Sequence, residues 1–213
     1  MRPPESWQRA RATLAIAAAT AVAWFIPGAI GYGEVASIYA GFIPARFAGF
    51  GEGVALVPLW LTPLTATLVH ASWAHILSNL IILLFCGRSV ENILGPLGLV
   101  ILYVVGAYVA AGAQYLVDPL SEVPMVGASG AVAALIGAYA LLFGRNKVKV
   151  ADPRLALALH VLWLAAAWVI LQIAIGLTFE TIGMSIAVAA HVGGFFLGVA
   201  LVRPLLLLRY RKA

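Results

Sequence analysis

Long apolar stretches separated by short polar connections run along the chain, and six of them are long enough to form spanning helices. They lie at about residues 12–31, 73–94, 97–117, 127–143, 155–177 and 184–208. Each meets or approaches the roughly 20 apolar residues that a helix needs to cross a bilayer. Their apolar positions are continuous, not alternating, which argues against spanning β-strands. The pattern predicts an all-α membrane protein built as a six-transmembrane-helix bundle.

The connection between the first two stretches, residues 32–63, is the longest in the chain. It is rich in Gly, Pro, Phe and Trp and poor in charged residues. Aromatic rings prefer the membrane–water interface. We therefore expect this segment to lie partly within the membrane.

The composition places the chain in the same class. Hydrophobic residues make up 63% of the 213 positions, charged residues make up 10%, and the mean hydropathy is +1.03. Soluble domains carry about 45–50% apolar and about 25% charged residues. The length predicts one domain at 12–208 with short tails at 1–11 and 209–213. The stretch 12–31 exceeds the roughly 7–15 apolar residues of a signal peptide, so we expect it to be a retained span.

Basic residues indicate the orientation of the predicted helices. If the N-terminus is inside, twelve of the thirteen Lys and Arg residues fall in inside segments, and only Arg46 falls outside. Cytoplasmic segments are enriched in Lys and Arg. Both termini are therefore predicted to be cytoplasmic, with 32–63, 118–126 and 178–183 on the outer side. The net charge of +5 reflects this topology, and no nucleic-acid partner is expected.

Polar side chains inside the apolar stretches gather at one depth. Within about two turns of the predicted outer surface lie His75, Ser78, Asn79, Ser129, Ser185 and His191. A polar side chain inside a bilayer costs free energy and tends to face a partner or a cavity. The shared depth predicts a functional site near the outer surface.

Ser129 stands at the start of the fourth stretch between Gly127 and Gly130, which permit a tight bend and a close helix approach. Free backbone N–H groups at a helix start can stabilise a developing oxyanion. The alternative is an ordinary N-cap serine. The pattern is not the G-x-S-x-G nucleophile elbow, because Gly130 follows the serine directly.

His191 shares a helix face with Gly194 and Gly198. This small-residue face can dock against a similar face of the fourth helix, formed by Gly130, Ala134 and Gly137. Such docking would bring the imidazole to the Ser129 hydroxyl. The alternative is a hydrogen-bonded packing histidine.

His75 and Asn79 lie four residues apart on one face of the second helix, and both can donate hydrogen bonds to an oxyanion. The alternative is polar contact between helices. No acidic residue falls in the outer half of a span, so catalysis would use a dyad of Ser129 and His191. A zinc site built from His70, His75 and His191 is disfavoured by its spacing and by the lack of H-E-x-x-H. We expect no metal and no cofactor.

These motifs, taken in order, resemble the rhomboid family of intramembrane serine proteases. They read His70-x4-His75-x3-Asn79, Gly127-Ala128-Ser129-Gly130 and Ala190-His191-x2-Gly194-x3-Gly198. The resemblance covers about residues 55–208 and extends to which span carries each motif. It implies an endopeptidase that cuts transmembrane segments of membrane-protein substrates, in a bacterial inner membrane, from a site open to the outer side.

The resemblance also assigns roles to single residues. It makes Ser129 the nucleophile and His191 the general base, with His75, Asn79 and the Ser129 backbone N–H as the oxyanion hole. It makes Glu91 structural and 32–63 a membrane-embedded loop.

Two positions depart from the family pattern. Ala133 stands where many members carry an aromatic residue near the histidine, and Leu61 follows Trp60 where an Arg is often found. The first departure leaves open what orients His191.

Two other functions compete with proteolysis. One is a catalytically silent relative that binds membrane proteins as an adaptor or chaperone, although such relatives typically lack the serine or the histidine. The other is a small transporter, but the polar residues form one shallow cluster and no path across the bilayer. The sequence leaves the substrate and the oligomeric state open.

Overall fold

The structure is a computed structural model that describes residues 6–54, 56–144, 150–181, 183 and 185–211. Apart from one isolated β-bridge, the regular structure in these ranges is helical. The helices are α1 (Arg11–Ala29), α2 (Gly33–Ala40), η1 (Pro44–Ala48), η2 (Leu59–Leu61), α3 (Thr62–Thr65), η3 (Ala66–Leu68), α4 (Trp73–Ile82), η4 (Leu83–Gly87), α5 (Arg88–Val117), α6 (Ser129–Phe143), α7 (Pro153–Glu180) and α8 (Val188–Tyr210).

The predicted all-α membrane protein is confirmed by these helices. Four stretches of the described chain are long and apolar enough to cross a membrane: Arg11–Ala29, Trp73–Val117, Pro153–Glu180 and Val188–Tyr210. The second of them is a continuous run of α4, η4 and α5 that contains a sharp break, so it supplies two of the predicted spans. The fourth predicted span, α6, is also apolar but has only 15 residues.

Gly95 makes the break between the second and third predicted spans. Its φ of 78° and ψ of 169° are not helical, and Pro96 begins the next helical segment. A residue with a side chain is strained at positive φ, whereas glycine adopts it freely. Proline suits the first helical turn because its missing N–H would have no partner there. The chain therefore reverses direction almost without a loop.

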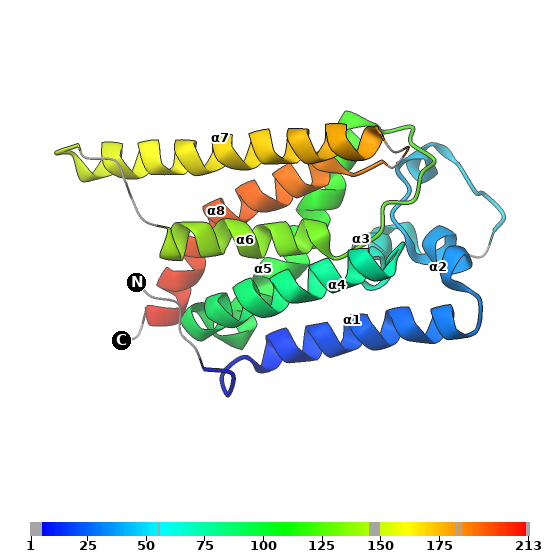
Figure 1. The fold of residues 1–213 in the computed structure, drawn as a ribbon, viewed down its shortest axis with the longest axis horizontal. Helices are drawn as coiled ribbons and strands as arrows, with labels where there is room; N and C mark the ends of the chain where they lie inside the picture. Colours follow the sequence, from blue (N-terminus) through cyan, green and yellow to red (C-terminus); the bar gives the residue numbers. More distant parts are fainter. Residues whose placement is uncertain (1–5, 55, 145–149, 182, 184, 212–213) are drawn as a thin grey trace.

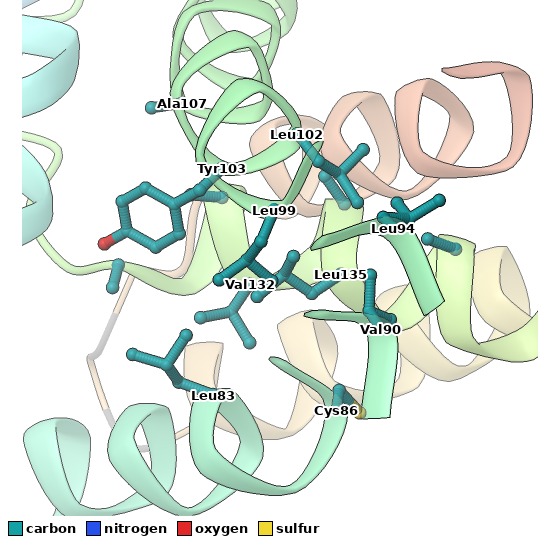
Figure 2. Close-up of a cluster of buried hydrophobic side chains, with 14 of the residues drawn as sticks. Leu83, Cys86, Val90, Leu94, Leu99, Leu102, Tyr103, Ala107, Val132 and Leu135 are labelled. Carbon is teal, nitrogen blue, oxygen red and sulfur yellow. The ribbon is translucent and has the colours of Figure 1, made fainter. Parts of the chain in front are cut away.

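The core lies between η4, α5, α6 and α8. Figure 2 shows side chains from η4 and α5, including Leu83, Leu99 and Leu102, converging on Val132 and Leu135 of α6. All five are almost fully buried. In Figure 1, α6 lies in the middle of the bundle, with α1 along one edge and α7 along the other.

Helices α6 and α8 approach each other backbone to backbone through small residues. A Cβ atom on Gly194 would overlap the Gly130 carbonyl oxygen, and one on Gly198 would overlap the Ala134 carbonyl oxygen. A Cβ on Gly137 would in turn overlap the Phe195 carbonyl oxygen. The two glycine-rich faces recognised in the sequence are thus in direct contact, as the small-residue pattern indicates.

The segment 32–63 contains more regular structure than its glycines and prolines suggest, namely α2, η1 and η2. It is tied to the connection before α6: Phe42 and Met125 form a two-way backbone bridge, with N···O distances of 3.0 and 2.8 Å. The Ala45 N–H donates to the Ser121 carbonyl oxygen at 3.0 Å. These bonds hold the chain that leads into Ser129.

Glu91 connects α5 to the start of α1. Its carboxylate accepts hydrogen bonds from the backbone N–H groups of Ala12 and Thr13, at 2.9 and 2.8 Å, and from the Thr13 hydroxyl at 2.7 Å. The first N–H groups of a helix lack partners within the helix, and the helix dipole favours a negative charge there. Glu91 therefore caps α1 across the bundle.

Ser185 was expected within the sixth span, and this expectation is wrong. Helix α8 begins only at Val188, and Ser185 is exposed in the connection before it. Hydropathy continues smoothly from Ile186 into the helix, so an apolar pattern alone places the boundary a few residues early.

Candidate active site

Ser129 is the first residue of α6, and Ala128 occupies the N-cap position before it. The N-terminal start of α6 receives no side-chain cap bond, so the structure does not support the alternative of an N-cap serine. Gly127 has a φ of 108°, a conformation that favours glycine. The turn it makes presents the Ser129 hydroxyl at the end of the helix.

The imidazole of His191 meets this hydroxyl. His191 lies in the first turn of α8, and its Nε2 atom is 2.7 Å from Ser129 Oγ. Both residues are half-buried. The close contact of α6 and α8 at Gly130 and Gly194 sets this distance, because each glycine lies within one turn of the pair.

The other ring nitrogen of His191 has a partner from α7. Nδ1 is 2.8 Å from Oε1 of Gln172, whose side chain is buried. An amide oxygen only accepts hydrogen bonds, so Nδ1 carries the proton and donates it. Nε2 then presents its lone pair to the Ser129 hydroxyl, which is the arrangement that a general base requires.

A second residue of α7 contacts the same histidine. The Trp168 indole N–H donates to the His191 carbonyl oxygen at 3.2 Å, and its ring stacks on Phe195 at a centroid distance of 5.0 Å. Neither Trp168 nor Gln172 was identified from the sequence. Gln172 does satisfy the criterion used above, a polar side chain in the outer half of a span, and a complete application would have included it.

His75 and Asn79 lie on α4, on the other side of the serine. A Cβ on Gly127 would come within 2.5 Å of the His75 Nε2 atom, so the imidazole packs directly on the turn before Ser129. Asn79 is buried, and its Nδ2 donates to the His75 carbonyl oxygen at 2.9 Å. An amide nitrogen carries two hydrogens, so one donor of Asn79 is used by its own helix and one is left.

His70 supports the same turn from outside the helix. It lies before α4, which explains why its ring reaches within 5.0 Å of the His75 ring despite a spacing that would separate them on one helix. Its Nε2 accepts from the Ala128 N–H at 3.4 Å. Burial, and then the neighbouring His75, lower the pKa of His70 to about 4. Within the described ranges, no group of three or more His, Cys, Asp or Glu side chains is arranged to hold a metal ion.

Comparison with known proteins identifies the class. The model of the rhomboid domain family matches residues 58–208, more than half of the chain. The chain belongs to the rhomboid family.

Two relatives show how far the similarity extends. The chain is 37% identical over 134 residues to the rhomboid protease GlpG of Pectobacterium atrosepticum. This match covers 62% of this chain and 44% of the relative. It is 35% identical over 133 residues to the rhomboid protease GlpG of Yersinia pestis. This match covers 62% of this chain and 43% of the relative. The matched region thus spans less than half the length of these relatives.

Proposed function

We propose that this protein is an intramembrane serine endopeptidase that cleaves transmembrane segments of membrane-protein substrates. The observation that carries the proposal is the 2.7 Å contact between Ser129 Oγ and His191 Nε2, made by half-buried side chains at the ends of two helices. Nucleophile and base within hydrogen-bond reach, with the base held by a third group, is the arrangement of nucleophilic catalysis. The similarity to proteins named rhomboid protease supports the same chemistry.

In the proposed reaction, His191 Nε2 takes the proton of the Ser129 hydroxyl as Oγ attacks the scissile carbonyl carbon. The carbonyl oxygen becomes an oxyanion at the start of α6. There the Ser129 backbone N–H and the positive end of the helix dipole stabilise it, with His75 and Asn79 as side-chain donors. His191 then protonates the leaving amine as the peptide bond breaks. A water molecule, deprotonated by His191, hydrolyses the acyl-enzyme and restores the serine.

The length of α6 supports a recessed site. Its 15 residues rise about 22 Å, whereas the hydrocarbon core is about 30 Å thick. With its inner end at the inner surface, α6 would begin below the outer surface, and Ser129 would face a hollow that water reaches. A peptide bond of a substrate helix could be cut there while the helix stays in the bilayer. The chemistry uses protein side chains and water, with no cofactor.

The basic residues support an orientation with both ends of the chain in the cytoplasm and the site open to the outer side. The similarity to bacterial proteins supports a bacterial membrane. The start of α1 and the end of α8 lie at the same end of the bundle in Figure 1, and the start of α6 lies at the other. We propose a single membrane domain at 12–208, flanked by tails at 1–11 and 209–213.

A fluorophosphonate probe tests the proposal, because it reacts with an activated serine and needs no known substrate. The detergent-solubilised protein should be labelled, and Ser129→Ala and His191→Ala should each abolish labelling and cleavage of a model transmembrane substrate. The double variant should be no worse than either single one, since the pair acts as a unit. Ser185→Ala, which removes an exposed serine before α8, is the matched control and should label normally.

Absence of labelling in a folded wild-type protein would refute the proposal and favour a role as a binding adaptor. Clearly additive losses in the double variant would argue against a dyad.

A further inference from the structure

We propose that Gln172 is a positioning residue for the general base: its amide oxygen holds the Nδ1–H of His191 and thereby keeps the Nε2 lone pair directed at Ser129. This inference rests on the proposed function and deepens it, because it assigns the orientation of the base to an uncharged side chain on α7.

The three side chains form a continuous hydrogen-bonded series. Gln172 Oε1 lies 2.8 Å from His191 Nδ1, and His191 Nε2 lies 2.7 Å from Ser129 Oγ. The residues come from three helices, α7, α8 and α6, so the arrangement is made by tertiary packing and not by local sequence. In a Ser-His-Asp triad, a carboxylate holds the same ring nitrogen.

The burial of Gln172 gives its amide no other partner of equal quality. The side chain is 4% exposed, so water does not replace a lost hydrogen bond. A buried amide without a partner is costly, and α7 is a largely apolar helix that contacts the bundle mainly through α8. The ring nitrogen of His191 is the partner the structure provides.

Other groups around His191 do not perform this task. Among the described residues, no carboxylate is hydrogen-bonded to its ring, and Ala133 of α6 offers only a methyl group. Trp168 binds the backbone carbonyl of His191 and not the ring. Trp168 and Gln172 are one turn apart on α7, so this helix holds the histidine by its backbone and by its side chain together.

Loss of the Gln172 acceptor should release the ring. The imidazole would then also populate the tautomer with the proton on Nε2, which cannot accept the serine proton. In a soluble Ser-His-Asp triad, a variant that holds the histidine in the wrong tautomer has a kcat about 10⁴-fold lower. Here no charge is lost, and we expect a decrease of about 10- to 100-fold, the range seen when a partner that orients a metal-binding histidine is removed.

Two replacements of similar length separate positioning from packing. Gln172→Met keeps the apolar volume and removes the acceptor, whereas Gln172→Glu keeps an acceptor oxygen and adds a buried charge. Positioning predicts that kcat for a transmembrane substrate falls about 10- to 100-fold in Gln172→Met, with KM nearly unchanged, and that Gln172→Glu retains more activity. Gln114→Met, in the outer part of α5, is the matched control and should behave as wild type.

The tautomer of His191 provides a readout that does not depend on turnover. The ring ¹⁵N chemical shifts of ¹⁵N-histidine-labelled protein, assigned with His191→Gln, should show a protonated Nδ1 and an unprotonated Nε2 in the wild type. Gln172→Met should shift the population toward Nε2–H, and Gln172→Glu should not.

Several results would overturn the inference: an Nε2–H tautomer in the wild type, an unchanged tautomer in Gln172→Met, or higher activity in Gln172→Met than in Gln172→Glu. A wild type that fails to react with the fluorophosphonate but shows the expected tautomers would refute the proposed function and leave the positioning of the ring supported.

Discussion

Adding one methyl group at Gly194 tests whether the separation of α6 and α8 sets the activity. A Cβ atom there would overlap the Gly130 carbonyl oxygen and lie 3.1 Å from the Gly130 carbonyl carbon and 3.3 Å from the Ala133 Cβ. Non-bonded carbon atoms rest at about 3.5–4.0 Å. The obstacle is backbone, which cannot rotate away, so the helices must separate by roughly 0.5–1 Å.

That separation acts on the Ser129–His191 contact one turn away. Added to the present 2.7 Å, it brings the distance between Oγ and Nε2 to the limit of a hydrogen bond. A misplacement of about 1 Å can cost about 10²-fold in rate. Overpacking costs roughly 1–3 kcal/mol, and the better helix propensity of alanine returns up to about 1 kcal/mol. Gly194→Ala should therefore lose far more activity than stability.

The assay compares kcat on a model transmembrane substrate in detergent with the thermal unfolding midpoint of the same preparation. Gly112→Ala is the matched control, because Gly112 lies on α5 with no heavy atom within 4 Å of an added Cβ. This control should keep full activity and gain slightly in stability. If Gly194→Ala cleaves at the wild-type rate while folding normally, the spacing argument is refuted.

Two further predictions concern residues on either side of the dyad. Asn79→Ala should lower kcat, but by less than the roughly 10²–10³-fold that removal of one oxyanion donor costs in a soluble protease. The effect should be smaller because one of the two amide hydrogens of Asn79 is already bonded to the His75 carbonyl oxygen. An unchanged kcat would show that Asn79 is not part of the oxyanion hole. Glu91→Gln should lower the free energy of unfolding by about 1–3 kcal/mol, because an amide cannot accept all three hydrogen bonds from Ala12 and Thr13. Thermal unfolding of Glu91→Gln in the Ser129→Ala background measures this, and a midpoint equal to that of Ser129→Ala alone would show that the cap contributes nothing.

The helices could be predicted because a helix that crosses a bilayer needs a long apolar run. The chain has few charged residues, so these runs are easy to recognise in the sequence. The docking of α6 on α8 could also be anticipated, because Gly130 on α6 and Gly194 and Gly198 on α8 have no side chains that would keep the two helices apart. In both cases one physical requirement, burial in lipid or close approach of two helix backbones, determines which residues the sequence must contain.

The parts that escaped prediction depend on contacts between distant segments. Gln172 becomes informative only when α7 lies against His191, 19 residues later in the chain. His70 approaches His75 because the chain bends before α4, and a helical spacing rule does not apply across a bend. The helix α2 lies within a glycine-rich segment whose hydrogen bonds to residues near Met125 hold it in place. Such features follow from tertiary structure.

The reversal at Gly95 has a consequence for how insertions would be tolerated. One residue added between Gly95 and Pro96 would rotate the following helix by about 100° about its axis, because an α-helix has 3.6 residues per turn. Leu99 and Leu102 would turn out of the core, and so would Ala110, whose Cβ lies 2.5 Å from a Cβ built on Gly130. A change at the Gly95 turn would thereby misalign the surface of α5 against which the start of α6 packs, so this turn should not tolerate an insertion.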